Sequence, residues 1–296
     1  MDRTERKGNQ AVRPSRPAAA ATILLGLALA AGGSLRSQVQ TQAPAAPAGR
    51  LVKQRTGEYN ISAHMFIIGK LGDVGLMTIG ETLRQSDAAL EKSLTLKGDA
   101  NAEQTKKNRD YHGKFDLVEV LPLRPDGSVD EDAVREWRGY EKSCSGILKL
   151  KKYQAENVRF FKDHAVATRE NGMERTVEGG YDSLLSPLAY LMEHEIKVGD
   201  AFETPYILNG KAHYFKSQVT GLDNLSEYKA KAYQIEISSF DKVVTEDRPT
   251  KDVWKKSGNI RIWFCKEGPY RNTLLRMRIK FRWYLWLYFN LQKLEG

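Results

Sequence analysis

The sequence has 296 residues, a formal net charge of +9, 41% hydrophobic residues and 28% charged residues. This composition excludes a fibrous or wholly disordered chain, and the length suits one large domain or two small ones. The first 30 residues carry five basic and two acidic side chains, so they contribute +3 and leave +6 for the rest. Such a mild basic excess favours an anionic envelope surface or plain solubility over a specific nucleic-acid site.

Residues 1–31 have the features of a secretory signal peptide. Arginine-containing residues 1–17 precede an apolar run of 14 residues, 18–31, which is too short to span a hydrocarbon layer of about 30 Å. Ala28-Leu29-Ala30 resembles a cleavage site, although a retained N-terminal anchor is an alternative. Residues 32–50, rich in Gln, Ala and Pro, predict a disordered linker. We therefore expect an exported protein, periplasmic or associated with the outer membrane, with one folded domain at 51–296.

The chain contains two cysteines, Cys144 and Cys265. In an oxidising compartment they could form a disulfide, and their positions in the sequence neither support nor exclude it. Alternatively, Cys265 is a buried free thiol on a strand. Without a Cys-x-x-Cys pair, the sequence predicts no structural zinc site and no redox motif, and we expect no metal or other cofactor.

Strand patterns dominate the rest of the chain. From Tyr59 to Met65, apolar and polar residues alternate with the period of a half-buried strand, and glycines at 69, 72 and 75 predict the turn to a second strand. Asn209-Gly210 between two apolar runs predicts another hairpin. Further strands are expected within residues 89–99, 110–123, 144–154, 157–171, 201–222, 227–240 and 260–268.

Two segments predict helical structure. Residues 124–137 begin with a polar turn and continue with one or two expected helical turns, with Asp130 as N-cap. Residues 181–198 predict the one long amphipathic helix, with Ser186 as N-cap and Pro187 at the first position. Its buried stripe is formed by apolar residues at helical spacing, Leu184, Leu188, Leu191 and Met192.

Glu193-His194-Glu195 raises the question of a metal-binding or catalytic helix. A zinc helix of the H-E-x-x-H type needs a second histidine four residues after the first, but position 198 is a valine. His194 also lies away from the apolar stripe. A structural helix is therefore the better interpretation, and no specific catalytic motif is present elsewhere.

The C-terminal segment 275–291 has the strictest alternation in the chain, because every odd position is apolar. A run of 17 residues is long for one strand, so we expect either a strongly bent strand or two strands with a corner near residues 282–284. The even positions carry basic and then aromatic side chains. We call these the basic-aromatic face and take them as weak ligand-binding candidates: Arg276, Arg278, Lys280, Arg282, Tyr284, Trp286 and Tyr288.

The basic-aromatic face has two interpretations. It is either the solvated outer face of a core strand, or a ladder of cations that meets an anionic ligand or lipid head groups. Amphipathic rings such as Trp286 favour a membrane-interface position.

The chain resembles exported bacterial proteins that contain domain of unknown function 3108. The resemblance is carried by GEYNISAHMFIIGKLGDVGLMTI at 57–79, by the helix, VGD and hairpin at 181–215, and by the closing strands at 256–281. It implies a mainly β fold, a curved antiparallel sheet or incomplete β-barrel packed on one amphipathic helix, in the cell envelope. It implies no catalytic residues. The chain differs from the family in lacking a glycine at the final corner, RWYLW.

A curved sheet over one helix can leave a concave apolar face for a lipid or another hydrophobic ligand. We therefore predict non-enzymatic binding of a lipid or another hydrophobic or anionic envelope ligand, with possible contact to a membrane surface. The alternative is an enzyme that acts on envelope polysaccharide or peptidoglycan through a carboxylate pair. Two carboxylates and aromatic rings inside the concavity would favour that alternative.

Overall fold

A computed structural model describes residues 50–86, 90–100, 112–128, 130, 133–144, 151–169, 171–208, 210–243, 253–282 and 285–296. The predicted signal peptide, and all of the predicted linker but Arg50, lie outside these residues. The described chain forms fourteen strands, one α-helix and one short 3-10 helix, η1, at Gly268–Tyr270. The strands are β1 (Arg50–Met65), β2 (Gly69–Gln85), β3 (Leu90–Ala100), β4 (His112–Leu123), β5 (Arg135–Cys144), β6 (Lys151–Phe160), β7 (His164–Arg169), β8 (Glu174–Glu178), β9 (Ala201–Leu208), β10 (Lys211–Leu225), β11 (Ala230–Val243), β12 (Val253–Cys265), β13 (Thr273–Arg282) and β14 (Leu285–Glu295).

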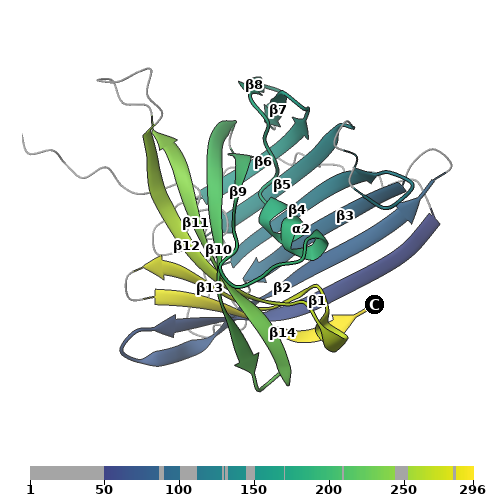
Figure 1. The fold of residues 1–296 in the computed structure, drawn as a ribbon. Coiled ribbons are helices and arrows are strands. Elements are labelled where there is room, and N and C mark those ends of the chain that lie inside the picture. The colour runs from purple at the N-terminus through teal and green to yellow at the C-terminus, as the bar shows by residue number, and fades with distance from the viewer. Residues whose placement is uncertain are drawn as a thin grey trace, which may run out of the picture.

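All fourteen strands belong to one antiparallel sheet, in the order β8-β7-β6-β5-β4-β3-β2-β1-β14-β13-β12-β11-β10-β9. The sheet curls strongly, and helix α2 (Ser186–Glu193) lies on its concave side between the β3–β5 and β9–β10 regions (Figure 1). This confirms the predicted mainly β fold, a curved antiparallel sheet packed on one helix.

The sheet does not close on itself, because its two edges, β8 and β9, do not pair. Other contacts bridge the gap between them. The carboxylate of Glu156 on β6 accepts a hydrogen bond of 2.7 Å from the backbone N–H of Gly210, in the β9–β10 turn. Gly210 has a positive φ of 62°, and a Cβ atom there would lie 3.1 Å from Arg175 Cδ on β8. The fold is therefore an incomplete barrel.

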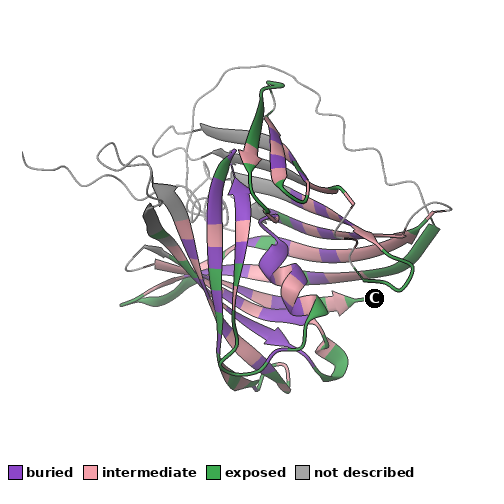
Figure 2. Ribbon diagram, turned by 45° about the horizontal axis from the view of Figure 1, so that its top comes forward, coloured by how far each residue is buried: buried purple, intermediate pink, exposed green. Residues whose placement is uncertain are grey.

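The core lies between the concave face and α2. Buried residues come from most strands of the sheet, including Tyr59, Met77, Phe160, Phe215 and Phe289, and Figure 2 shows buried and less buried residues alternating along several strands. Alternation explains this pattern, because side chains of one parity share a face of a strand. On β13 and β14 most of the described odd positions are buried as predicted, namely Leu275, Met277, Ile279, Leu287, Phe289 and Leu291, whereas Leu285 is half-buried.

The helix is shorter than its apolar pattern predicts. It spans eight residues rather than 181–198, and its N-cap is Leu185, with no side-chain cap. Ser186 is the first helical residue, and its hydroxyl donates to the backbone oxygen of Ser183 at 2.7 Å, so the predicted Ser186 cap is wrong. Leu184 is buried outside the helix. A buried leucine in the non-helical turn before α2 thus has the same sequence spacing as an additional helical residue would have.

The first hairpin turns earlier than predicted. β1 ends at Met65, which pairs with Gly69, so the turn is formed by residues 66–68. The glycines at 72 and 75 lie within β2. The turn was misplaced because its three residues are all apolar, whereas turns usually contain Gly, Pro, Asn, Asp or Ser.

Three further segments test the sequence interpretation. The described part of 124–137 forms a turn and then the start of β5, with no helical turn. The long terminal segment is two strands, with its corner between Arg282 and Leu285, which confirms the second of the predicted alternatives. The β9–β10 hairpin is also confirmed.

Cys265 is a buried free thiol, so the structure does not contain the Cys144–Cys265 disulfide. Its Sγ donates to the backbone oxygen of Glu267 at 3.1 Å, and burial raises the pKa of the thiol. Cys144 ends β5, and six strands separate β5 from β12 in the sheet.

Candidate functional site

The structure brings the described members of the basic-aromatic face together on the outer side of β13 and β14. Arg278 pairs in register with Tyr288, and Lys280 pairs with Trp286. Lys280 is exposed, whereas the other described members are half-buried. The side chains of Arg282 and Tyr284 lie outside the described residues.

Arg276 does not behave as one rung of a uniform cation ladder. Its Nε donates a hydrogen bond of 3.0 Å to Asn290 Oδ1, and its guanidinium also forms an ion pair with Glu227. The same guanidinium lies 5.5 Å from the ring centroid of Trp263. Arg276 is therefore a structural cross-link between β13, β14 and the β10–β11 turn, and its charge is already compensated by Glu227.

A polar groove of about 730 Å³ runs beside Arg276, over β1 and β14. Its charged groups have ion-pair partners, as in the 2.8 Å ion pair between Lys70 and Asp73. That pairing holds the pKa of Asp73 below its ordinary value. The charged side chains of the groove already have partners. A ligand would have to break these ion pairs before it could bind to the side chains.

A second pocket, of about 380 Å³, opens on the concave side next to α2. We call it the helix pocket. Its walls come from β4, β5, β6, β9, α2 and the segment that links β8 to α2. Carboxylates, cations and aromatic rings all contribute to the lining, among them Glu119, Arg135, Phe160, Asp182, Tyr190 and Thr204.

Glu119 is the most unusual group in the helix pocket. It is 1% exposed, and Ser183 Oγ donates a hydrogen bond of 2.5 Å to its Oε2. Burial raises its pKa to about 7, although the Ser183 hydrogen bond and the charge of Arg135 oppose the rise. The sequence contained a signal for this site, because Glu119 stands between Leu117 and Leu121 on the apolar face of β4.

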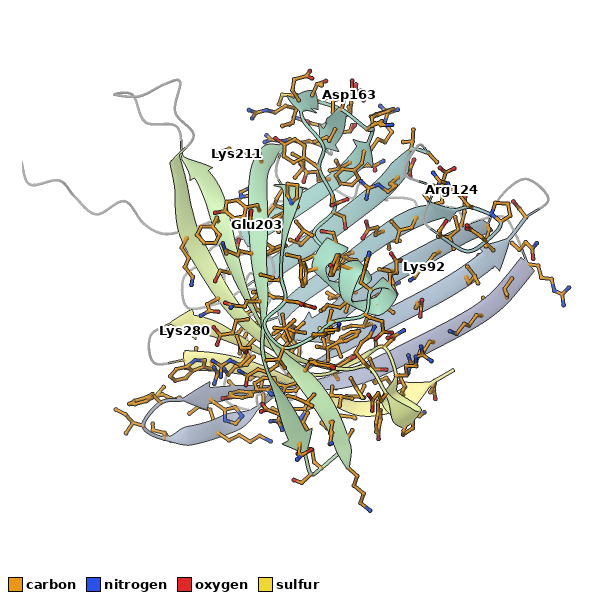
Figure 3. All side chains as sticks on the ribbon, viewed as in Figure 1. Lys92, Arg124, Asp163, Glu203, Lys211 and Lys280 are labelled. Carbon is orange, nitrogen blue, oxygen red and sulfur yellow. The ribbon has the colours of Figure 1, made fainter. Side chains whose placement is uncertain are left out.

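Ion pairs fix the polar wall of the helix pocket. Arg135 on β5 pairs with Asp182 and donates a further hydrogen bond of 3.1 Å to the backbone oxygen of Tyr181. Lys92 on β3 lies beside α2 (Figure 3), with its Nζ 3.1 Å from a Glu81 oxygen and 3.2 Å from a Glu193 oxygen. These pairs anchor both ends of the helical connection to the β3–β5 wall.

His194 lines the helix pocket, but not as a metal ligand. Its ring stacks on Tyr190 with the centroids 4.1 Å apart, and Tyr190 stacks in turn on Phe202. Its backbone N–H donates to the oxygen of Tyr190, which ends the helix. Among the described residues, no group of three or more His, Cys, Asp or Glu is placed to hold a metal ion.

The hydroxyl of Thr204 on β9 is a buried polar group among the residues that line the helix pocket. Its Oγ1 is buried and has no hydrogen-bond partner within the described part of the chain. A buried hydroxyl without a partner costs roughly 1–3 kcal/mol. Thr204 also lines the helix pocket, so a change of its side-chain rotamer would present this hydroxyl to a ligand there.

The apolar side of α2 leaves much less space. The cavity between its leucines and the sheet measures about 70 Å³ and is lined by Ile79, Leu184, Pro187, Leu188, Phe215 and Met277. Binding sites for small molecules usually measure roughly 300–1,000 Å³. Helix α2 therefore fills the apolar part of the concave face and leaves the polar pocket beside it.

No helix in the described ranges has the length and apolar character needed to cross a bilayer.

Comparisons with known proteins give one match. The crystal structure of a beta-barrel-like protein of domain of unknown function DUF1849 from Brucella abortus superimposes with a TM-score of 0.49 and 12% sequence identity, over 84% of this chain and 99% of that chain. No protein-family model matches the sequence. No curated protein matches it either. The resemblance to domain of unknown function 3108 therefore stays a prediction.

Proposed function

We propose that this protein is an exported envelope protein that binds an uncharged, hydroxyl-rich ligand, such as a saccharide unit, in the helix pocket without changing it chemically. The observation that carries the proposal is the pocket itself: about 380 Å³, lined by Glu119 and by Thr204, whose buried hydroxyl has no partner among the described residues. Its volume lies in the range of small-molecule sites.

The chemistry of the wall supports an uncharged ligand. Arg135 is already paired with Asp182, and Lys92 bridges Glu81 and Glu193. A positively or negatively charged ligand would therefore find no unpaired opposite charge among these groups. Glu119 is largely protonated below its pKa of about 7 and can then both donate and accept a hydrogen bond. Hydroxyl groups match such mixed donors and acceptors.

The space argues against an acyl chain under the helix. The predicted lipid site would occupy the apolar concave face, but the cavity there measures only about 70 Å³. A lipid in that position would have to displace α2, which is held by Lys92 and by buried leucines. We therefore move the proposed ligand from the apolar face to the polar pocket.

One observation favours catalysis as a second candidate. A carboxylic acid with a pKa near 7, close to a second carboxylate, is a combination found in enzymes that cleave glycosidic bonds. Here Glu119 would be the acid and Asp182 the second carboxylate. Both groups are engaged in the structure, Glu119 with Ser183 and Asp182 with Arg135, so binding remains the first proposal.

Saturation-transfer NMR with a panel of neutral mono- and disaccharides tests the proposal on the full chain. We expect at least one saccharide to bind, and Thr204→Val to weaken it on the order of tenfold, because one hydrogen bond is lost. Thr220→Val, an exposed change on β10, is the matched control and should bind normally. If no saccharide binds, or if Thr204→Val binds as well as the control, the proposal fails.

A polysaccharide substrate separates binding from catalysis. Release of reducing ends from polysaccharide by the wild type, abolished in Glu119→Gln, would establish the enzyme. Saccharide binding without any release of reducing ends would leave the binding function alone.

A further inference from the structure

The turn between β1 and β2 exposes three large apolar side chains in succession. Phe66 is 73% exposed, Ile67 84% and Ile68 68%. We call these three residues the apolar tip. The hairpin that carries them projects beyond β13 and β14 at the lower left of Figure 1. Runs of exposed apolar residues disfavour solubility, so they are usually kept where they have a function.

Folding of the hairpin does not require these residues. The register continues to the last pair, Met65 with Gly69, and Gly69 has the positive φ of 79° that ends the turn. The conformation of the turn is thus determined by Gly69 and by the hydrogen-bonded pairing of β1 with β2. Polar residues at 66–68 would be compatible with the same turn, and none of the three belongs to the buried core.

Aromatic and basic groups follow the apolar tip in a fixed order. The Phe66 ring lies 5.9 Å from Trp286, and His64 lies 4.3 Å from Tyr288, measured between ring centroids. Lys280 is opposite Trp286 in the register, and Figure 3 shows it at the end of the molecule from which the hairpin projects. Beyond the apolar tip, the surface therefore has two successive levels at which an aromatic ring of β14 and a cation of β13 lie side by side, first Trp286 with Lys280 and then Tyr288 with Arg278.

This order matches the depth profile of a bilayer surface. Apolar side chains are favourable at the acyl boundary, Trp and Tyr at the interface, and Lys or Arg near anionic head groups. A second copy of the chain is a poorer partner, since a stable protein interface buries roughly 20–30 residues on each side and the tip offers three.

We propose that the apolar tip inserts into the interface of a membrane that contains anionic phospholipid, with Trp286, Tyr288, Arg278 and Lys280 at head-group level. The site is separate from the helix pocket and does not depend on the proposed saccharide function. It gives the basic-aromatic face its partner and adds the residues that enter the bilayer.

The experiment measures binding of the full chain to phospholipid vesicles by sedimentation, with about 30% phosphatidylglycerol or with phosphatidylcholine alone. We expect the triple variant Phe66→Ser/Ile67→Ser/Ile68→Ser to partition at least tenfold less into the anionic vesicles. Lys280→Gln should lower binding on the order of threefold to fivefold, and added salt should remove that difference.

A matched control removes three exposed apolar side chains elsewhere: Met173→Ser/Val198→Ser/Leu222→Ser. It should bind within about twofold of the wild type if the apolar tip is the specific anchor. All these positions are exposed, so the unfolding midpoints should stay close to that of the wild type.

The apolar run at 18–31 could itself hold the chain on vesicles, so a second readout reports on the tip. Brominated phosphatidylglycerol should quench the fluorescence of Trp286, seen as the difference between the wild type and Trp286→Phe, and the tip variant should lose this quenching. Equal quenching in the tip variant and the control, or no quenching assigned to Trp286, would overturn the proposal. So would a dimer of the wild type that becomes a monomer in the tip variant.

Discussion

Lys266 donates hydrogen bonds from its ammonium group to the backbone oxygen of Leu191, at 3.0 Å, and to that of His194, at 2.9 Å. The residue follows β12, and it therefore joins the sheet to the C-terminal end of α2. The carbonyl groups of a last helical turn have no partners in the helix and carry partial negative charge, so a cation there is favourable. Burial lowers the pKa of Lys266, which nevertheless stays close to the oxygens that stabilise its charge.

Replacing Lys266 by methionine should lower the free energy of unfolding by about 2 kcal/mol, because two carbonyl oxygens lose a charged donor. Urea unfolding followed by circular dichroism measures this loss. Lys211→Met, at the exposed first residue of β10, is the control and should change the free energy by less than about 0.5 kcal/mol. Equal effects of the two changes would show that Lys266 does not anchor α2.

Glu119 should make stability depend on pH. Its pKa is about 7 in the folded protein against an ordinary value of 4.5, so the native state holds one more proton between these values. Stability should therefore be fully present below about pH 4.5 and fall as the pH rises through about 7, by roughly 3 kcal/mol in total. Urea unfolding at about pH 5 and about pH 8 measures the difference.

Glu119→Gln removes this titrating group and should abolish most of the pH dependence. Glu203→Gln, which changes an exposed carboxylate on β9, should keep it. A wild-type protein whose stability does not fall between about pH 5 and about pH 8 would contradict the buried, protonated state of Glu119.

Arg276 and Arg278 are neighbours on the basic-aromatic face, yet they should differ in their effect on stability. Arg276→Ala loses the Asn290 hydrogen bond, the Glu227 ion pair and the contact with Trp263, and should cost about 1–2 kcal/mol. Arg278→Ala should cost less than about 0.5 kcal/mol, as surface substitutions usually do. Thermal unfolding of both variants checks the ranking, and equal costs would contradict the cross-linking role of Arg276.

Much of the fold could be predicted because alternation is a local property. The inward positions of β1, β13 and β14 follow directly from their period of two, and the corner near residue 283 follows from strand length. β8 was not predicted, since five mostly polar residues at an edge show no alternation that differs from a loop. The helix was overestimated because Leu184 and Ile196 are buried for tertiary reasons outside the helix.

The helix pocket could not be predicted as a unit. Glu119, Asp182 and Thr204 lie on β4, on the connection before α2 and on β9, and only the curl of the sheet brings them together. A carboxylate between Leu117 and Leu121 on an apolar strand face was the one local sign of it. The three apolar residues of the tip can be read directly from the sequence. Their position in a turn could not be predicted, because turn preferences favour the glycines that follow them.

The strand order also determines how this sheet assembles. Of the thirteen pairings among the fourteen strands, twelve join strands that are consecutive in the chain, and one, β1 with β14, joins the two ends. Each half, β1–β8 and β9–β14, is thus a meander in which every strand pairs with its neighbour in the chain, and such local pairing favours fast folding for a β protein. A circular permutant opened between β8 and α2, with residue 296 linked to residue 50, would convert the fold into one uninterrupted meander in which every strand follows its neighbour.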